Sequence, residues 1–228
     1  MLRGFWRYGI PATIHKVRHS LIRSMDKSEY WLLDSVVEAW CPLVWLVSED
    51  IEGAFNKRNH GLKRGELVTV LDHLFQRGDL LAKQNESEFV PAQADIEEAL
   101  DGRRDCLYGL TSQGGVRWEE VSHPQWERYI TACVYADPQD GEIVGSDRAL
   151  VEKYDSLSHY AWDISVVADS RRWDVLQPWQ ATYWKTLPLG HRVRFSYDWV
   201  ERPPEWKTNA AISEWLKEIN SWYTPYET

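Results

Sequence analysis

The sequence predicts an α+β protein, because helical and strand-like periodicities alternate along the chain. Apolar residues recur every three to four positions at 28–40 and at 64–77, as in helices with one buried face. The stretch 80–91 is typical of two short strands around a polar tip at 85–87. Residues 190–200 alternate between apolar and polar side chains, which favours a half-buried strand.

Two helices are expected before residue 60. Ser28 is predicted to cap the first, which should continue until Pro42 stops it. The second is expected from Ser48 to about residue 57, because acidic residues in its first turn complement the helix dipole.

The third helix has the clearest pattern. Its apolar stripe consists of Leu67, Leu71, Leu74 and Phe75, and Gly78 is predicted to terminate it. A strand should follow at once, and Pro91 confines the second strand of the hairpin to a sheet edge.

The stretch "LYGLTSQGGVRWEEV" (107–121) predicts a strand joined directly to a helix, and a short helix is expected before it at 94–100. Thr111 is a good N-cap, and Val116, Trp118 and Val121 are predicted to pack the helix back onto the core. The two glycines should keep the first turn of this helix unobstructed.

These motifs resemble those of a known family. "LVTVLDHLFQRGDLL" is similar to the third helix and first wing strand of MarR-like and PadR-like regulators, and "YGLTSQGG" resembles their Tyr-x-Leu-Thr-x-x-Gly joint. The resemblance covers about residues 26–122 and implies a winged helix-turn-helix domain. In that family the third helix enters the major groove of DNA and the wing contacts phosphates.

We therefore expect three segments: a basic arm or extension (1–25), the winged-helix domain (26–122) and a small aromatic-rich α+β module (123–228). The arm carries five basic groups and no acid, a composition that also fits a targeting segment or sequence upstream of a start at Met25. The last module should contain two strands around 137–141, a helix capped by Asp147, strands at 161–168 and 190–200, and a final helix at about 208–223. Nine of the 14 tryptophans lie beyond residue 125, which suits either a bulky core or a partner-binding face.

Composition excludes several classes of protein. No apolar run approaches the roughly 18 residues of a membrane helix. The three cysteines are too widely spaced to predict a disulfide framework or a zinc site. No catalytic motif surrounds isolated polar residues such as His159, near Asp155 and Asp163. We expect a cytoplasmic, noncatalytic protein with no cofactor and no membrane partner.

The candidate contact residues are basic side chains around the third helix and on the wing. They are Lys57, Arg58, His60, Lys63, Arg64 and Lys83. Glu66, Asp72, Glu86 and Glu88 lie among them and would repel phosphates.

Two functions therefore stay open. The first is a DNA-associated transcriptional regulator, whose partner is double-stranded DNA. The second is an acidic protein-binding module, such as an immunity, antitoxin or adaptor protein, which fits the formal charge of −9 and a basic partner. A homodimer is left open for both.

Overall fold

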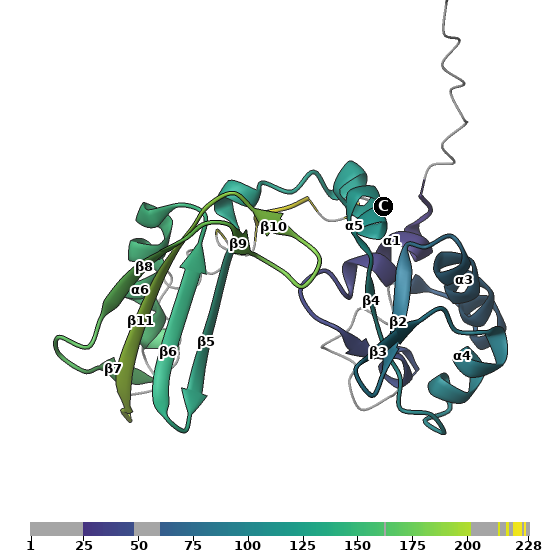
Figure 1. Ribbon diagram of the computed structural model, residues 1–228, viewed down its shortest axis with the longest axis horizontal. Helices are drawn as coiled ribbons and strands as arrows, with labels where there is room; N and C mark the ends of the chain where they lie inside the picture. The colour runs from purple at the N-terminus through teal and green to yellow at the C-terminus, as the bar shows by residue number, and fades with distance from the viewer. Residues whose placement is uncertain are drawn as a thin grey trace, which may run out of the picture.

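A computed structural model describes residues 25–47, 60–161, 163–201 and positions 214, 218, 221–224 and 226. These residues form a mixed α and β structure with two lobes (Figure 1). The helices are α1 (Lys27–Asp34), η1 (Leu43–Leu46), α3 (Arg64–Gln76), α4 (Gln93–Leu100), α5 (Ser112–Ser122), η2 (Trp126–Arg128) and α6 (Arg148–Ala161). The strands are β1 (Cys41–Pro42), β2 (Leu80–Gln84), β3 (Ser87–Phe89), β4 (Leu107–Leu110), β5 (Ile130–Ala136), β6 (Gln139–Gly145), β7 (Ile164–Val166), β8 (Arg172–Leu176), β9 (Trp179–Gln180), β10 (Thr186–Leu187) and β11 (Gly190–Trp199).

Helix α1 begins and ends earlier than its sequence pattern predicts. Asp26 caps it by accepting a hydrogen bond from the backbone N–H of Glu29 at 2.8 Å. The predicted cap, Ser28, is wrong, because its hydroxyl donates to the carbonyl of His60 at 2.7 Å. The helix ends at Asp34. It does not continue to Pro42, and beyond its end the backbone carbonyl of Val36 accepts a hydrogen bond from a side chain of the other lobe.

Helix α3 and the hairpin confirm the prediction. The predicted stripe of α3 is buried, and Gly78 follows the helix with a φ of +81°, a conformation that glycine adopts without strain. Strands β2 and β3 then pair antiparallel, with Ala82 opposite Phe89. In the sheet of this lobe the strand order is β1-β4-β2-β3.

The joint between β4 and α5 has the predicted cap, since Thr111 Oγ1 accepts from the backbone N–H of Gly114 at 3.0 Å. Its glycines do more than clear the first turn. A Cβ on Gly114 would lie 2.0 Å from the backbone oxygen of Asp79, and one on Gly115 would lie 2.1 Å from a ring atom of Trp184. Glycine thus allows a helix, a strand and an aromatic side chain to approach closely.

The inward face of α5 differs in part from the prediction. Trp118 is fully buried, but Val116 is 53% exposed and does not pack onto the core. The buried positions of α5 are 114, 115, 118 and 122. Val116 therefore lies outside the face that α5 turns toward the core. Val121, the third predicted contact, is partly buried and packs against the core as expected.

The second lobe is built on a five-stranded antiparallel sheet ordered β5-β6-β11-β7, with β8 also paired to β11. The long strand β11 has the predicted alternation: Val193, Phe195 and Tyr197 are buried, whereas Arg192 and Arg194 form ion pairs outside this core. Helix α6 packs on the sheet, as Figure 1 shows. Asp147 caps it as predicted by accepting from the backbone N–H of Leu150 at 3.0 Å.

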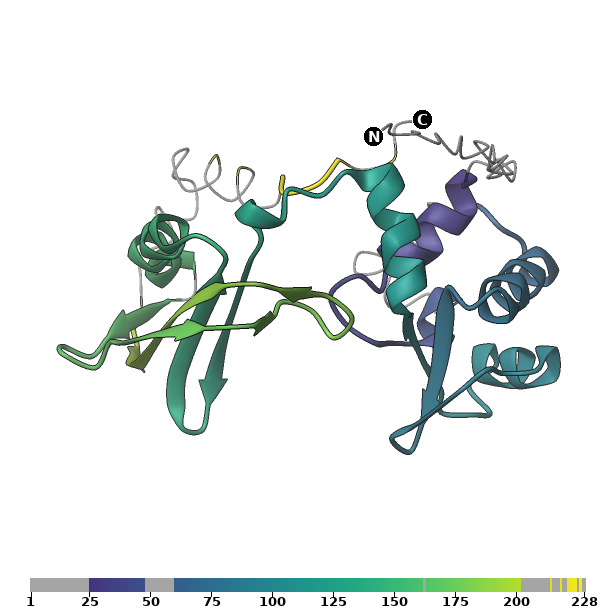
Figure 2. The same cartoon turned by 45° about the horizontal axis from the view of Figure 1, so that its top comes forward.

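An aromatic segment between β8 and β11 joins the lobes. The short hairpin of β9 and β10 reaches from the second lobe toward the first (Figures 1 and 2). At its tip Tyr183 donates to the carbonyl of Val36 at 2.6 Å, and the indole of Trp184 donates to that of Val37 at 2.8 Å. The strands of this segment are too short to leave an alternating pattern in the sequence.

The core of the first lobe continues across residue 122. Trp118, Trp126, Tyr129, Trp184 and Trp222 form a cluster whose neighbouring ring centroids lie 4.7–6.5 Å apart. The pairs are edge-to-face or tilted, and such contacts stabilise the junction beyond the burial of apolar area.

Three expectations fall outside the described residues: the arm up to residue 24, the second helix at 48–57 and most of the final helix at 208–223. Among the described helices, none combines the length and the apolar character needed to span a membrane.

Candidate functional site

The basic residues at the start of α3 lie on the surface, and α4 and its C-cap residue bind one of them. Arg64 forms an ion pair with Asp101, just beyond α4, and also donates to the carbonyl of Glu97 at 3.0 Å. Lys63 is exposed, and its backbone N–H donates to the carboxylate of Glu66 at 2.9 Å. Arg64 is therefore held by α4 rather than extended toward solvent.

His60 lies in a different environment. It is 8% exposed, and its Nδ1 accepts a hydrogen bond from the backbone N–H of Leu62 at 3.0 Å. Burial lowers the pKa of the ring, so the imidazole is neutral at physiological pH. In this position His60 helps to hold the turn before α3. Its role as a residue that contacts DNA or a protein partner stays a prediction.

On the hairpin, Lys83 is engaged twice. Its ammonium lies 2.6 Å from the carboxylate of Glu86 and 5.8 Å from the ring centroid of Trp40. Lys57 and Arg58, the other two candidates, lie outside the described residues. The structure thus brings Lys63 and Arg64 together, places Lys83 on another element and turns His60 inward.

Acidic residues dominate around these candidates. Residues 60–122 contain seven Lys and Arg against twelve Asp and Glu. Two further arginines near α4 are also paired, Arg103 with Asp101 at 2.9 Å and Arg104 with Asp95. Because all of these cations except Lys63 have a carboxylate partner, the described surface offers little net positive charge to a polyanion.

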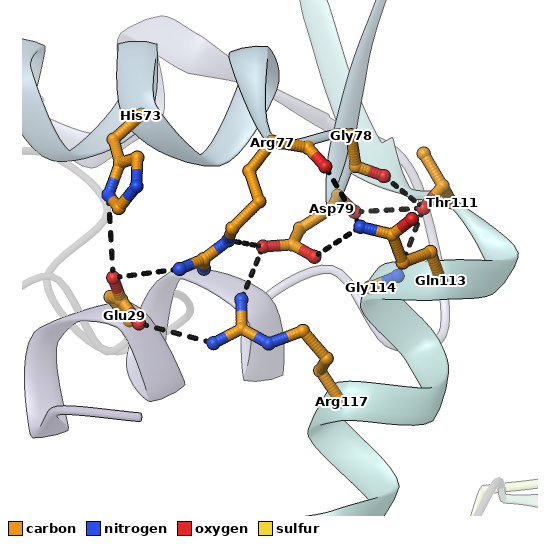
Figure 3. Close-up of polar contacts among 9 residues, drawn as sticks. All are labelled: Glu29, His73, Arg77, Gly78, Asp79, Thr111, Gln113, Gly114 and Arg117. Carbon is orange, nitrogen blue, oxygen red and sulfur yellow. Dashed lines mark hydrogen bonds and ion pairs between the residues drawn. The ribbon is translucent and has the colours of Figure 1, made fainter. Parts of the chain in front are cut away.

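A buried cluster of charged side chains was not predicted from the sequence (Figure 3). Asp79 is fully buried, and both Arg77 and Arg117 form ion pairs with its carboxylate. The same two arginines reach Glu29 on α1, at 3.4 and 3.5 Å. The cluster ties α1, the end of α3, the start of β2 and α5 together.

Hydrogen bonds complete this cluster. The Thr111 hydroxyl donates to the carbonyl of Gly78 at 2.6 Å, and the Gln113 amide donates to the carbonyl of Arg77 at 2.8 Å. His73 Nδ1 lies 3.7 Å from Glu29 at the exposed edge (Figure 3). A buried charge is tolerated when it is paired and hydrogen-bonded, so these side chains have a structural role in the lobe. The only sign of this cluster in the sequence is that two residues of opposite charge, Arg77 and Asp79, flank Gly78.

The polar residues noted in the second lobe also form a structural group. His159 Nε2 lies 3.5 Å from Asp155 on the same helix, and Arg171 Nε donates to Asp155 at 2.8 Å. These contacts fasten α6 to the segment that leads into β8.

The described residues also give little indication of metal or thiol chemistry. Within them, no group of three or more His, Cys, Asp or Glu side chains is placed to hold a metal ion. Burial raises the pKa of the Cys41 thiol to about 11, which keeps it protonated and weakly reactive at neutral pH.

Comparison with protein families, with curated proteins and with solved structures finds no match to this chain.

Proposed function

We propose that this chain is a noncatalytic binding protein that engages a basic protein partner through the acidic surface of its first lobe. The order α3, β2, β3, β4, α5, with an antiparallel hairpin directly after α3, supports the view that this surface is built on a winged-helix frame. In this proposal the frame serves protein contact rather than DNA contact.

The observation that carries the proposal is the pairing of the candidate basic residues. Arg64 is bound to Asp101 and Lys83 to Glu86, so a phosphate backbone would have to displace carboxylates to reach either side chain. Affinity for nucleic acid depends mainly on cations that neutralise phosphates. A surface on which acids outnumber bases lacks that driving force and attracts a basic partner instead.

Several carboxylates on this surface are available to a partner. Glu88 on the hairpin and Glu97 and Glu98 on α4 are exposed. Within the described part of the chain, no Lys, Arg or His forms an ion pair with any of these three side chains. Exposed unpaired charges steer a partner of opposite sign and set the orientation of the complex.

The test is a pull-down from native lysate, with and without nuclease, using wild type and Glu97→Lys with Glu98→Lys. A basic protein should be retained after nuclease treatment, should be released by salt, and should be lost from the double variant at least tenfold. Glu120→Lys, at an exposed position on α5, is the matched control and should retain the partner. Equal retention by the double variant would contradict the proposal.

A second candidate function is DNA binding by α3, which lies directly before the hairpin. It is favoured by the exposure of Lys63, the N-cap of this helix, and of Thr69 within it. Titration of duplex DNA with the full chain tests it. Lys63→Glu with Arg64→Glu should abolish binding, Lys27→Glu on α1 should not, and the affinity should fall steeply with salt. If wild type shows no salt-sensitive duplex binding, this candidate is excluded.

A further inference from the structure

A cavity of about 630 Å³ lies between the end of α1 and the C-terminal residues 222 and 223. Pockets that bind small molecules typically measure about 300–1,000 Å³. Its walls combine two carboxylates with four aromatic side chains: Asp34, Glu38, Trp40, Trp45, Trp222 and Tyr223. The exposed acids of the proposed protein contact do not line it, so the cavity is a separate feature of the molecule.

Among the described residues, neither carboxylate has a counter-charge. Within the described ranges, no Lys, Arg or His forms an ion pair with Asp34 or Glu38, in contrast to the acids of the buried cluster. Asp34 accepts a hydrogen bond from the indole N–H of Trp118 at 2.9 Å, and the Tyr223 hydroxyl lies 3.5 Å from its other oxygen. A positively charged occupant would therefore meet two cavity carboxylates that no described cation neutralises, and its charge would be attracted to both.

The pKa shifts of the two carboxylates agree with the absence of a described cation beside them. Burial raises the pKa of both Asp34 and Glu38, and the charge of Asp34 raises that of Glu38 further. Glu38 is nevertheless exposed to solvent, which is the situation of a side chain that lines a cavity and is surrounded by protein. A cation between the two groups would favour both ionised forms.

The aromatic walls are held in place by the core. Trp222 and Tyr223 lie with ring centroids 4.8 Å apart, and they pack against the buried Trp118 at 5.7 and 5.2 Å. Trp40 already has the ammonium of Lys83 near its ring, but Lys83 pairs with Glu86 rather than with the cavity carboxylates. Aromatic faces attract organic cations and also pack against their apolar parts.

We propose that this cavity binds a small organic cation, an alkylammonium or guanidinium compound, with its charge between Asp34 and Glu38 and its apolar part against the tryptophan walls. A free molecule and the Lys or Arg side chain of a partner share this chemistry, and the titrations below distinguish the two sources. The proposal does not depend on the proposed protein contact.

Calorimetric titration of the full chain with choline, agmatine and phenethylamine tests the need for positive charge. The neutral control is 3,3-dimethyl-1-butanol, which has the shape of choline without its charge. At least one cation should bind, and the neutral compound should bind at least tenfold more weakly than choline if choline is that cation. No binding of any of the three cations at up to about 10 mM, or equal binding of the neutral compound, would overturn the proposal.

Charge-neutral variants locate the site. Glu38→Gln should weaken binding at least tenfold, whereas Glu88→Gln on the hairpin, a matched change at an exposed position, should leave it unchanged. Asp34→Asn is the second variant, because its amide oxygen can still accept from Trp118. Circular dichroism confirms that each variant is folded, and unchanged affinity in both cavity variants would sink the idea.

Nα-acetyl-arginine amide, a mimic of a protein side chain, distinguishes the source of the cation. If it alone binds, and does so with dependence on Glu38, the occupant belongs to a partner protein and the free-molecule proposal is wrong. These titrations contain no protein partner and no DNA. Their failure would leave the proposed function intact, and loss of partner binding would leave the cavity proposal intact.

Discussion

Helix α1 contributes one carboxylate to each of two contrasting environments. Glu29 belongs to the buried cluster, where Arg77 and Arg117 neutralise it and Asp79 together. Asp34, at the other end of the helix, lies with Glu38 in a cavity where no described cation pairs with them. The difference teaches how to interpret acids that lie against the protein core: acids with counter-charges in the fold are structural, and acids without them are candidates for binding a ligand or partner.

The largest expected effect is the loss of stability that follows when the central acid of the buried cluster is removed. Asp79→Ala leaves two arginines with one carboxylate at a fully buried position, and removing one partner of a buried ion pair typically costs about 3–5 kcal/mol. Urea unfolding followed by circular dichroism measures the loss. A change below about 1 kcal/mol would show that the cluster contributes little to stability and would remove the contrast between the two environments.

A smaller loss is expected from Gly114→Ala, which forces the backbone of α5 away from Asp79. The new Cβ would lie 2.0 Å from the backbone oxygen of Asp79, and overpacking of this kind costs about 1–3 kcal/mol. Gly65→Ala on α3 is the matched control, because nothing lies within 4 Å of its Cβ and alanine favours a helix. Equal stability of the two variants in thermal unfolding would contradict the close approach at the joint.

The smallest expected effect is a gain in stability rather than a loss, and it concerns the unpaired carboxylates of the cavity. Glu38 faces Asp34 and the hydroxyls of Tyr129 and Tyr223, and burial raises its pKa in the folded state. A raised pKa means that stability present at low pH is lost as the carboxyl ionises with rising pH. Glu38→Gln should therefore be slightly more stable than wild type at pH 7 and equal to it below about pH 4.

The measurement for that prediction is the thermal midpoint of wild type and variant across this pH range, with Glu88→Gln as the control. A gain that persists unchanged at low pH would show that ionisation of Glu38 is not its cause. A loss of stability at pH 7 would mean that Glu38 has a favourable partner in the folded protein, and it would weaken the case for a cation in the cavity.

Local sequence patterns predicted the elements whose burial follows from their own periodicity. The stripe of α3, the hairpin after Gly78, the Thr111 cap and the alternation of β11 are all present. The cap of α1 was not predictable, because Asp26 and Ser28 are both good capping residues near the start of the helix. The hydroxyl of Ser28 bonds to His60, whereas the carboxylate of Asp26 accepts from Glu29. The winged-helix resemblance and the two functions stay predictions.

The basic side chains around α3 could be named from the sequence, but their state of pairing could not. Arg64 meets Asp101 across 37 positions, and the burial of His60 depends on how the turn before α3 lies against the rest of the lobe. Whether a surface lysine or arginine is available to a partner is a tertiary property, because ion pairs form between elements rather than along them.

By itself, the sequence determined the α+β class, most described helices and strands and the acidic balance of the chain. Helices and strands follow from the local periodicity of apolar residues, and the net charge is a sum over the composition. The tertiary structure alone decided which charges meet. Asp79 and Arg117 are 38 positions apart, and Asp34 and Tyr223 are 189 apart. Such contacts depend on the packing of helices and strands against one another, so the paired cluster and the unpaired cavity leave no pattern along the chain.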